Sequence, residues 1–249
     1  MQVRSPTLEE WFLQYQMASL RGRHFHFPVD LDLNITALVE KYRVDGRKPP
    51  YTAILIKAVA EATKRHPEVN RAVFRTFYGT KIVEFDEVNV NLPIIYQHQG
   101  KEHVGAMVLK AANAMTIGEI CDAIRDEISK PLSSRPVGRQ VVGRANNFLN
   151  RWKLRCIHFF VYNFPHFYLK FGGGGVSVSS LLNYAEDGFV CRPVSFGHTA
   201  LTFCCSDVRI ENGQHILRVG VGYDHFAGGG HTAIAAFRTL ARITASGDL

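Results

Sequence analysis

The sequence predicts one α/β domain, residues 1–249, built on a mixed β-sheet. Segments with helical spacing of apolar residues are interleaved with short strand-like segments, which is the element order of an α/β fold. Asn212-Gly213 stands between two strand-like runs and is a strong signal for an antiparallel hairpin. No internal repeat or linker divides the chain, so we expect a single domain.

In the first part of the chain, helix caps and alternation define the elements. Thr7 and Glu10 have capping-box spacing ahead of an apolar helical run. Pro28 lies inside a strand-like run and favours an edge or irregular position, because proline cannot donate to a strand ladder. The predicted elements are a helix within residues 5–20, a strand at 24–33, a short helix at 35–42 and a largely buried helix at 51–66.

The later elements follow from the same signals. Thr116 and Glu119 repeat the capping-box spacing before another helix. We expect strands around a turn at 78–81, a strand at 104–112, a helix at 117–129, a strand within 176–182, the two hairpin strands at 199–210 and 215–225, and a closing helix at 231–243.

The net charge of +7 is concentrated in one segment. Between Glu127 and Glu186 there is no acidic residue, and this segment alone carries +8, which leaves −1 for the rest of the chain. Such an excess favours an anionic partner: a phosphorylated cofactor, an acidic carrier protein, a membrane surface or nucleic acid, although a merely solvated basic face fits as well. The basic residues are Lys130, Arg135, Arg139, Arg144, Arg151, Lys153, Arg155 and Lys170.

Aromatic residues are interleaved with these basic ones. Single-stranded nucleic-acid binders have this composition, but so do amphipathic helix pairs and the walls of acyl pockets, and we expect no nucleic-acid partner.

Cysteine usage and hydropathy indicate the compartment. The five cysteines form no C-x-x-C pair and leave an odd number, which fits free thiols in a reducing environment. No run of about 18 uncharged apolar residues is present, and the first residues lack the apolar stretch of a signal peptide. We therefore expect a soluble, cytoplasmic protein.

His225 is the leading candidate for chemistry. It stands where a strand ends and a loop begins, a common place for a catalytic side chain, and a neutral imidazole can accept a proton from a thiol or hydroxyl. A structural or surface role remains the alternative for any one of the 11 histidines.

The chain contains residues for two other kinds of site. His24 and His26 lie two apart on a predicted strand and share a face, with His225 or His231 as further ligands, but no H-E-x-x-H or paired C-x-x-C spacing accompanies them. We expect no metal. Ser177, Ser179 and Ser180 lack a G-x-S-x-G elbow, so hydrogen bonding to a developing oxyanion suits them better than nucleophilic attack.

Three separated stretches together resemble one family, the catalytic domain of the dihydrolipoamide acyltransferases of 2-oxoacid dehydrogenase complexes, related to chloramphenicol acetyltransferase. Asp224, His225 and Gly230 match its terminal D-H-R-x-x-D-G motif. "YTAILIKAVAEATKRHPEVN" resembles its buried helix and P-x-x-N, ending at Asn70. "VSVSSLL" resembles its serine strand and aligns Ser179 with the family serine.

The resemblance implies a two-layer sandwich with a mixed sheet, assembled as a homotrimer with active sites at subunit interfaces. His225 would be the general base, and Ser179 of a neighbouring subunit would donate to the oxyanion. Asp224, Gly229 and Gly230 would support the site. No cofactor would be bound permanently, and a coenzyme A or phosphopantetheine thioester would be the substrate.

Two features of the chain depart from the family pattern. Phe226 replaces the arginine after the histidine, and Gly229 replaces the acidic or amide residue that normally braces the site. No lipoyl domain, subunit-binding domain or linker precedes the catalytic part, so we expect a free-standing homologue that uses acyl-CoA or an acyl carrier protein.

The basic, aromatic segment at about 130–171 is longer than the family's usual connection and is read as an insertion. We expect its phenylalanines to line an acyl site and its basic residues to meet coenzyme A phosphates or an acidic carrier protein; the alternative is an amphipathic helix on the trimer or on a membrane surface. The residues concerned are Phe159, Phe160, Phe164, Phe167, Arg151, Lys153 and Arg155.

The sequence thus predicts an acyltransferase that moves an acyl group from a thioester to a small thiol, hydroxyl or amine acceptor. The alternative is a catalytically degenerate homologue that acts as a trimeric scaffold for acyl thioesters or a protein partner.

Overall fold

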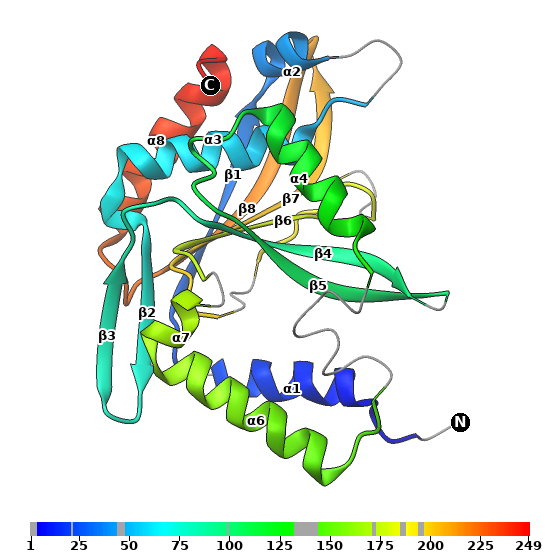
Figure 1. The fold of residues 1–249 in the computed structure, drawn as a ribbon. Coiled ribbons are helices and arrows are strands. Elements are labelled where there is room, and N and C mark those ends of the chain that lie inside the picture. The colour runs from blue at the N-terminus through cyan, green and yellow to red at the C-terminus, as the bar shows by residue number, and fades with distance from the viewer. Residues whose placement is uncertain are drawn as a thin grey trace.

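A six-stranded mixed sheet, order β1-β8-β7-β6-β4-β5, organises the protein, and β2 and β3 form a separate hairpin (Figure 1). The computed structural model describes residues 4–20, 22–43, 48–98, 100–131, 144–170, 173–184, 188–193 and 197–249. Strand β6 pairs in parallel with β4 and β7, while the other pairings are antiparallel. The strands are β1 (His26–Asn34), β2 (Arg71–Thr76), β3 (Gly79–Glu84), β4 (Val90–His98), β5 (Lys101–Leu109), β6 (Val176–Ser180), β7 (Leu201–Glu211) and β8 (Gln214–Asp224).

Helices cover one face of this sheet, which confirms the predicted two-layer α/β sandwich. Figure 1 shows α2, α3, α4 and α8 on that face. Ile54, Leu55 and Val59 of α3 are fully buried and belong to the same apolar core as Val219 and Val221 of β8. The helices are α1 (Leu8–Leu20), α2 (Thr36–Tyr42), α3 (Tyr51–Arg65), α4 (Ile117–Ser129), α6 (Phe148–Asn163), α7 (Pro165–Lys170) and α8 (Gly230–Ser246), with a 3-10 turn at Pro67–Val69.

The local signals in the sequence act where they were expected. The Glu10 N–H donates to Thr7 Oγ1 (3.2 Å), and Thr116 and Glu119 form a complete capping box at α4. Asn212 (φ 50°) and Gly213 (φ 78°) adopt the left-handed conformation of a tight hairpin turn between β7 and β8. Strand β1, which contains Pro28, lies at the edge of the sheet.

One predicted turn lies slightly earlier than expected, because β3 already begins at Gly79. Strands β2 and β3 meet at Phe77 and Tyr78, at the start of the predicted 78–81 turn. The family-like Asn70 just before β2 is buried, and its Nδ2 donates to the carbonyl oxygens of Phe85 (2.9 Å) and Glu87 (3.0 Å). Asn70 therefore holds the two ends of the hairpin together.

The basic, aromatic segment forms α6 and α7, on the side of the sheet away from α3 (Figure 1). Leu154 of α6 is buried against Leu8 and Phe12 of α1, so these two helices pack as a pair. Arg135 and Arg139 of this segment lie outside the described residues. In the part of the chain that is described, no helix has the length and apolar character needed to span a bilayer.

Candidate active site

His225 lies in the turn that joins the end of β8 to the start of α8. The backbone N–H of His225 donates to the carbonyl oxygen of Phe25 (2.9 Å). This bond fixes the backbone of the turn against Phe25, the residue that precedes β1. The imidazole packs against Phe27 (ring centroids 4.7 Å apart) and Phe25 (5.8 Å), and an added Cβ on Gly230 would lie 3.7 Å from its Cε1. The residue is exposed, so the ring is supported on one side and open to solvent on the other.

Asp224 lies directly below this turn and is fully buried. Its Oδ1 accepts the N–H groups of Phe25 (3.1 Å) and Phe226 (3.0 Å), and its Oδ2 is 2.7 Å from His24 Nδ1. Burial acts to raise the pKa of Asp224, but the hydrogen bonds from His24 and the two backbone N–H groups outweigh it and hold the pKa below its usual value. An ionised carboxylate therefore fixes the main chain at Phe226, next to His225, and at Phe25, whose carbonyl oxygen accepts the backbone N–H of His225.

Arginines from β2 supply contacts to the turn that its own sequence lacks. Arg71 Nη1 donates to the Ala227 carbonyl oxygen (2.8 Å). The Arg75 guanidinium lies 4.3 Å from the centroid of the Phe226 ring, a cation–π contact. Phe226, which stands where the family pattern has arginine, is thus paired with an arginine from another strand.

Gly229 is the N-cap residue of α8 and makes no side-chain cap hydrogen bond. Its carbonyl oxygen accepts the N–H of Thr232 (3.1 Å), and its φ of −70° is open to any residue. The turn is therefore held by Asp224 and Arg71, without a side chain at position 229. Gly229 thus supplies no side-chain cap to α8, and other contacts order the turn.

Ser179 lies on β6, and its Oγ donates to the Phe203 carbonyl oxygen (3.2 Å). In the register of the sheet Ser179 is opposite Cys204, and Cys204 is opposite Gly220 of β8. His225 is five residues beyond Gly220, which corresponds to about 17 Å along the strands. One chain alone therefore does not bring Ser179 and His225 together.

The predicted basic residues lie on α6. The guanidinium groups of Arg151 and Arg155 lie 5.3 Å and 5.5 Å from the centroid of the Trp11 ring, and Arg151 Nε donates to Asn146 Oδ1 (2.6 Å). Both arginines thus help α6 pack on α1. Lys153 is exposed.

The four predicted phenylalanines touch one another at the C-terminal part of α6 and the start of α7. Their contacting ring centroids lie 5.4 to 6.4 Å apart, and Phe77 of the hairpin stacks on one of them. Three of these rings, those of Phe159, Phe160 and Phe167, are more than a third exposed. They make an aromatic cluster on the surface and line neither of the two cavities described below.

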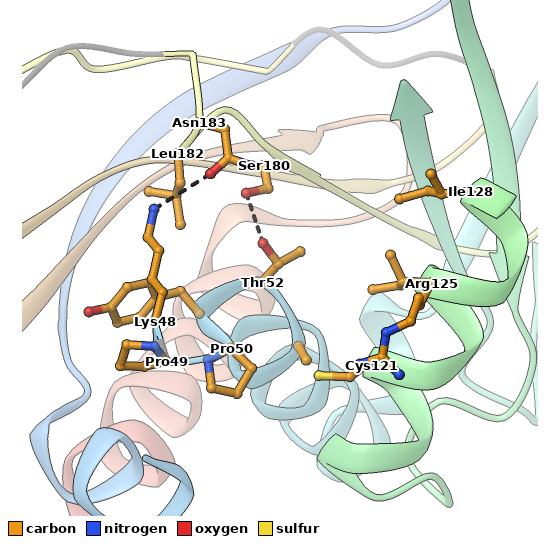
Figure 2. Close-up of a pocket in the computed structure, with 13 residues that line it drawn as sticks. Lys48, Pro49, Pro50, Thr52, Cys121, Arg125, Ile128, Ser180, Leu182 and Asn183 are labelled. Carbon is orange, nitrogen blue, oxygen red and sulfur yellow. Dashed lines mark hydrogen bonds between the residues drawn. The ribbon is translucent and has the colours of Figure 1, made fainter. Parts of the chain in front are cut away.

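A cavity of about 380 Å³ lies between α3, α4 and the end of β6 (Figure 2). Thr52 Oγ1 donates to Ser180 Oγ (2.8 Å), and Lys48 Nζ donates to Asn183 Oδ1 (3.5 Å). A smaller cavity of about 210 Å³ lies nearby and shares Lys48. Ser180, at the first cavity, faces the helix-covered side of the sheet through its contact with Thr52 of α3. Ser179 points to the opposite face from Ser180, because neighbouring strand residues alternate.

Sequence reasoning missed Arg71, Arg75 and the role of His24. Arg71 directly follows Asn70 of the P-x-x-N stretch, which was the one local signal that pointed to its neighbourhood. His24 was noted only as a metal-ligand candidate, since its partner Asp224 is 200 residues away along the chain.

Comparison with known proteins supports the fold. No protein-family model and no curated protein sequence matches the chain. The truncated catalytic core of the 2-oxoacid dehydrogenase multienzyme complex from Thermoplasma acidophilum is similar with a TM-score of 0.71 at 13% identity, over 100% of both chains. Chloramphenicol acetyltransferase gives 0.54 at 11% identity, over 97% of this chain and 99% of that one.

A dihydrolipoamide acetyltransferase from Azotobacter vinelandii gives a TM-score of 0.67 at 14% identity, over 98% of this chain and 91% of that one. Its structure was determined to investigate a serine, a histidine and an asparagine in the catalytic mechanism, with the asparagine four residues after the histidine. At these identities the three similarities show the fold, which is that of dihydrolipoamide acyltransferase cores and chloramphenicol acetyltransferase.

Proposed function

We propose that this protein is an acyltransferase that moves an acyl group from a coenzyme A or carrier-protein thioester to a small thiol, hydroxyl or amine acceptor. The observation that carries the proposal is the presentation of His225: its backbone is fixed, its ring rests on Phe27, and its other side is open to an incoming substrate. The shared fold with acetyltransferases supports this class of reaction.

In the proposed reaction, His225 removes the proton from the acceptor while the acceptor's sulfur, oxygen or nitrogen attacks the thioester carbonyl carbon. The carbonyl oxygen becomes negatively charged, and the Ser179 hydroxyl donates a hydrogen bond to it. Collapse of this intermediate breaks the C–S bond, and protonated His225 returns the proton to the departing thiolate. General-base catalysis contributes about 10²- to 10⁴-fold and an oxyanion donor about 10²- to 10³-fold.

The proposal requires two copies of the chain at each site. Since Ser179 and His225 of one chain lie about 17 Å apart along the strands, both can act on one carbonyl only if they come from different subunits. We propose a homotrimer with a site at each interface. Light scattering should then give about three times the chain mass of 28.0 kDa, and a fully active monomer would rule out the shared site.

The role of His225 is tested by measuring the release of free thiol from a panel of acyl-CoA donors, each mixed with small acceptors. His225→Ala should lower kcat/KM by about 10²- to 10⁴-fold. His231→Ala is the matched control, because His231 is also exposed and is the second residue of α8, only six residues later. Equal turnover by wild type and His225→Ala would remove His225 from the mechanism, whereas acyl-CoA binding without turnover by wild type would identify the scaffold alternative.

The basic residues of α6 are proposed to meet the phosphates of coenzyme A or an acidic carrier protein. Lys153 is the residue to reverse, because Arg151 and Arg155 also hold α6 against α1. Lys153→Glu should raise the KM for the donor with little change in kcat. Arg125→Glu, at the cavity in Figure 2, is the comparison. A higher donor KM in this variant alone would indicate that the donor binds at the cavity and not at α6.

A further inference from the structure

Two histidines and a carboxylate converge beneath the His225 turn. His26 of β1 is paired with Asp224 of β8 in the sheet register, and His24 lies two residues before His26. The rings of His24 and His26 are 5.7 Å apart between centroids. One potential ligand atom from each of His24, His26 and Asp224 lies within 4.8 Å of the other two, which is close enough for all three to bind one ion.

The histidines of this cluster have nitrogen atoms without hydrogen-bond partners. The side chain of His24 is only 5% exposed and that of Asp224 is 0% exposed, so water contributes little there. Nevertheless, Nε2 of His24 and Nε2 of His26 are buried and unpartnered. A buried polar atom is costly to leave unsatisfied, and an ion in this cluster would supply the partner that His26 Nε2 lacks.

The surroundings prepare these rings for metal binding. His24 Nδ1 lies 2.7 Å from Asp224 Oδ2, so one ion can bind both atoms when it displaces the proton between them. The unpartnered Nε2 of His26 offers a further ligand atom from the neighbouring ring.

Arg23 is a positively charged residue next to His24 in the chain. Nη1 of Arg23 is buried, and the charge of Arg23 helps to lower the pKa values of His198 and His158, after the larger effect of burial. The His198 ring lies 5.9 Å from that of His24, and its Nδ1 is hydrogen-bonded to the Val73 carbonyl oxygen (2.8 Å). The ionised carboxylate of Asp224 gives the three-residue cluster a negative charge to balance a cation.

We propose that His24, His26 and Asp224 bind a divalent transition-metal ion, with Zn²⁺ as the best match. Two imidazoles and one carboxylate form a donor set that zinc uses in proteins, and three protein ligands leave one position open. The ion connects the start of β1 to the end of β8, directly below His225. It thereby stiffens the turn in which Gly229 offers no side chain. This site does not depend on acyl transfer.

The test is zinc binding by the full-length protein after its metal has been removed with a chelator. Zn²⁺ is titrated in competition with a chromogenic chelator, and Co²⁺ is added separately to record its visible d–d absorption. Wild type should bind one equivalent per chain, and His26→Gln should weaken binding by at least about 100-fold, because it removes a ligand but leaves the His24–Asp224 pair intact.

His66→Gln is the matched control. His66 also faces a carboxylate, with its Nδ1 3.2 Å from Glu68 Oε1, but its Nε2 is already paired with Thr239 Oγ1 (2.8 Å). Its zinc affinity should equal that of wild type. Thermal unfolding adds a second readout: Zn²⁺ should raise the Tm of wild type and of His66→Gln but not that of His26→Gln. A dissociation constant weaker than about 100 µM, or equal zinc binding by His26→Gln and wild type, would overturn the proposal.

Discussion

Replacing Asp224 by asparagine tests whether this buried carboxylate holds the His225 turn in place. The change keeps the size of the side chain, but its three hydrogen bonds lose their charge and the amide cannot reproduce all of them. Hydrogen bonds to charged groups contribute about 1.5 to 3 kcal/mol and neutral ones about 0.5 to 1.5 kcal/mol. The hydrogen bonds donated by the backbone N–H groups of Phe25 and Phe226 should each contribute about 1 kcal/mol less to stability. The hydrogen bond with His24 should contribute about 2 kcal/mol less.

Part of this loss is offset because a neutral amide costs less to bury than a carboxylate. We therefore expect Asp224→Asn to lower the free energy of unfolding by about 2 to 3 kcal/mol, or the Tm by roughly 5 to 10 °C for a chain of this length. The assay is denaturant unfolding at pH 7 in the presence of a chelator, so that bound metal does not contribute.

Asp122→Asn is the control for this measurement. Asp122 also pairs with a cation, Arg125 (2.7 Å), but its side chain is 66% exposed. Ion pairs of this kind contribute little, and we expect a change below about 0.5 kcal/mol. If the two variants differ by less than that amount, Asp224 does not hold the turn as we describe.

Further predictions concern the same turn and its surroundings. Gly229→Asn should supply the missing cap of α8 and raise the free energy of unfolding by a few tenths of a kcal/mol, about 1 °C in Tm, provided that the exposed His231 ring moves aside; a lower Tm would contradict this. Arg71→Gln should lower kcat by roughly tenfold with little change in donor KM, because the Ala227 carbonyl loses its contact and the His225 turn its position; steady-state kinetics test this, and an unchanged kcat would show that Arg71 is dispensable. Burial lowers the pKa of His198 to about 3, so between about pH 3 and 6.5 the unfolded chain binds a proton that the folded chain excludes. Stability should therefore fall as the pH drops below about 6.5, by up to about 1.4 kcal/mol per pH unit, and urea unfolding across this range should show a smaller slope for His198→Gln; equal slopes would refute this cause.

Residues from distant parts of the chain hold the His225 turn, in which position 229 is a glycine. Gly229 has no side chain to brace the turn, but Arg71, Asp224 and Arg75 contact its main chain or the Phe226 ring. The site has kept an ordered histidine by using contacts from β2 and from the residues before β1.

Local patterns predicted most of the elements. The capping boxes at Thr7 and Thr116, the Asn212-Gly213 hairpin and the edge position of Pro28 each depend on residues within a few positions of one another, and each is present. The position of the β2–β3 turn was predicted slightly too late. Glycine is a favoured turn residue and placed the predicted turn at Gly79, but Gly79 pairs with Thr76, which leaves Phe77 and Tyr78 as the turn.

The sequence by itself determined the order of helices and strands, the caps, the hairpin and the place of His225 at the end of a strand, because short-range spacing and backbone preference encode these features. Only the tertiary structure decided what surrounds that histidine. His24 and Asp224 are 200 residues apart, and Arg71 and Ala227 are 156 apart. Contacts at such separations depend on how the strands pair and how the helices pack over the sheet, and no local pattern in the chain records which distant side chains that packing brings together.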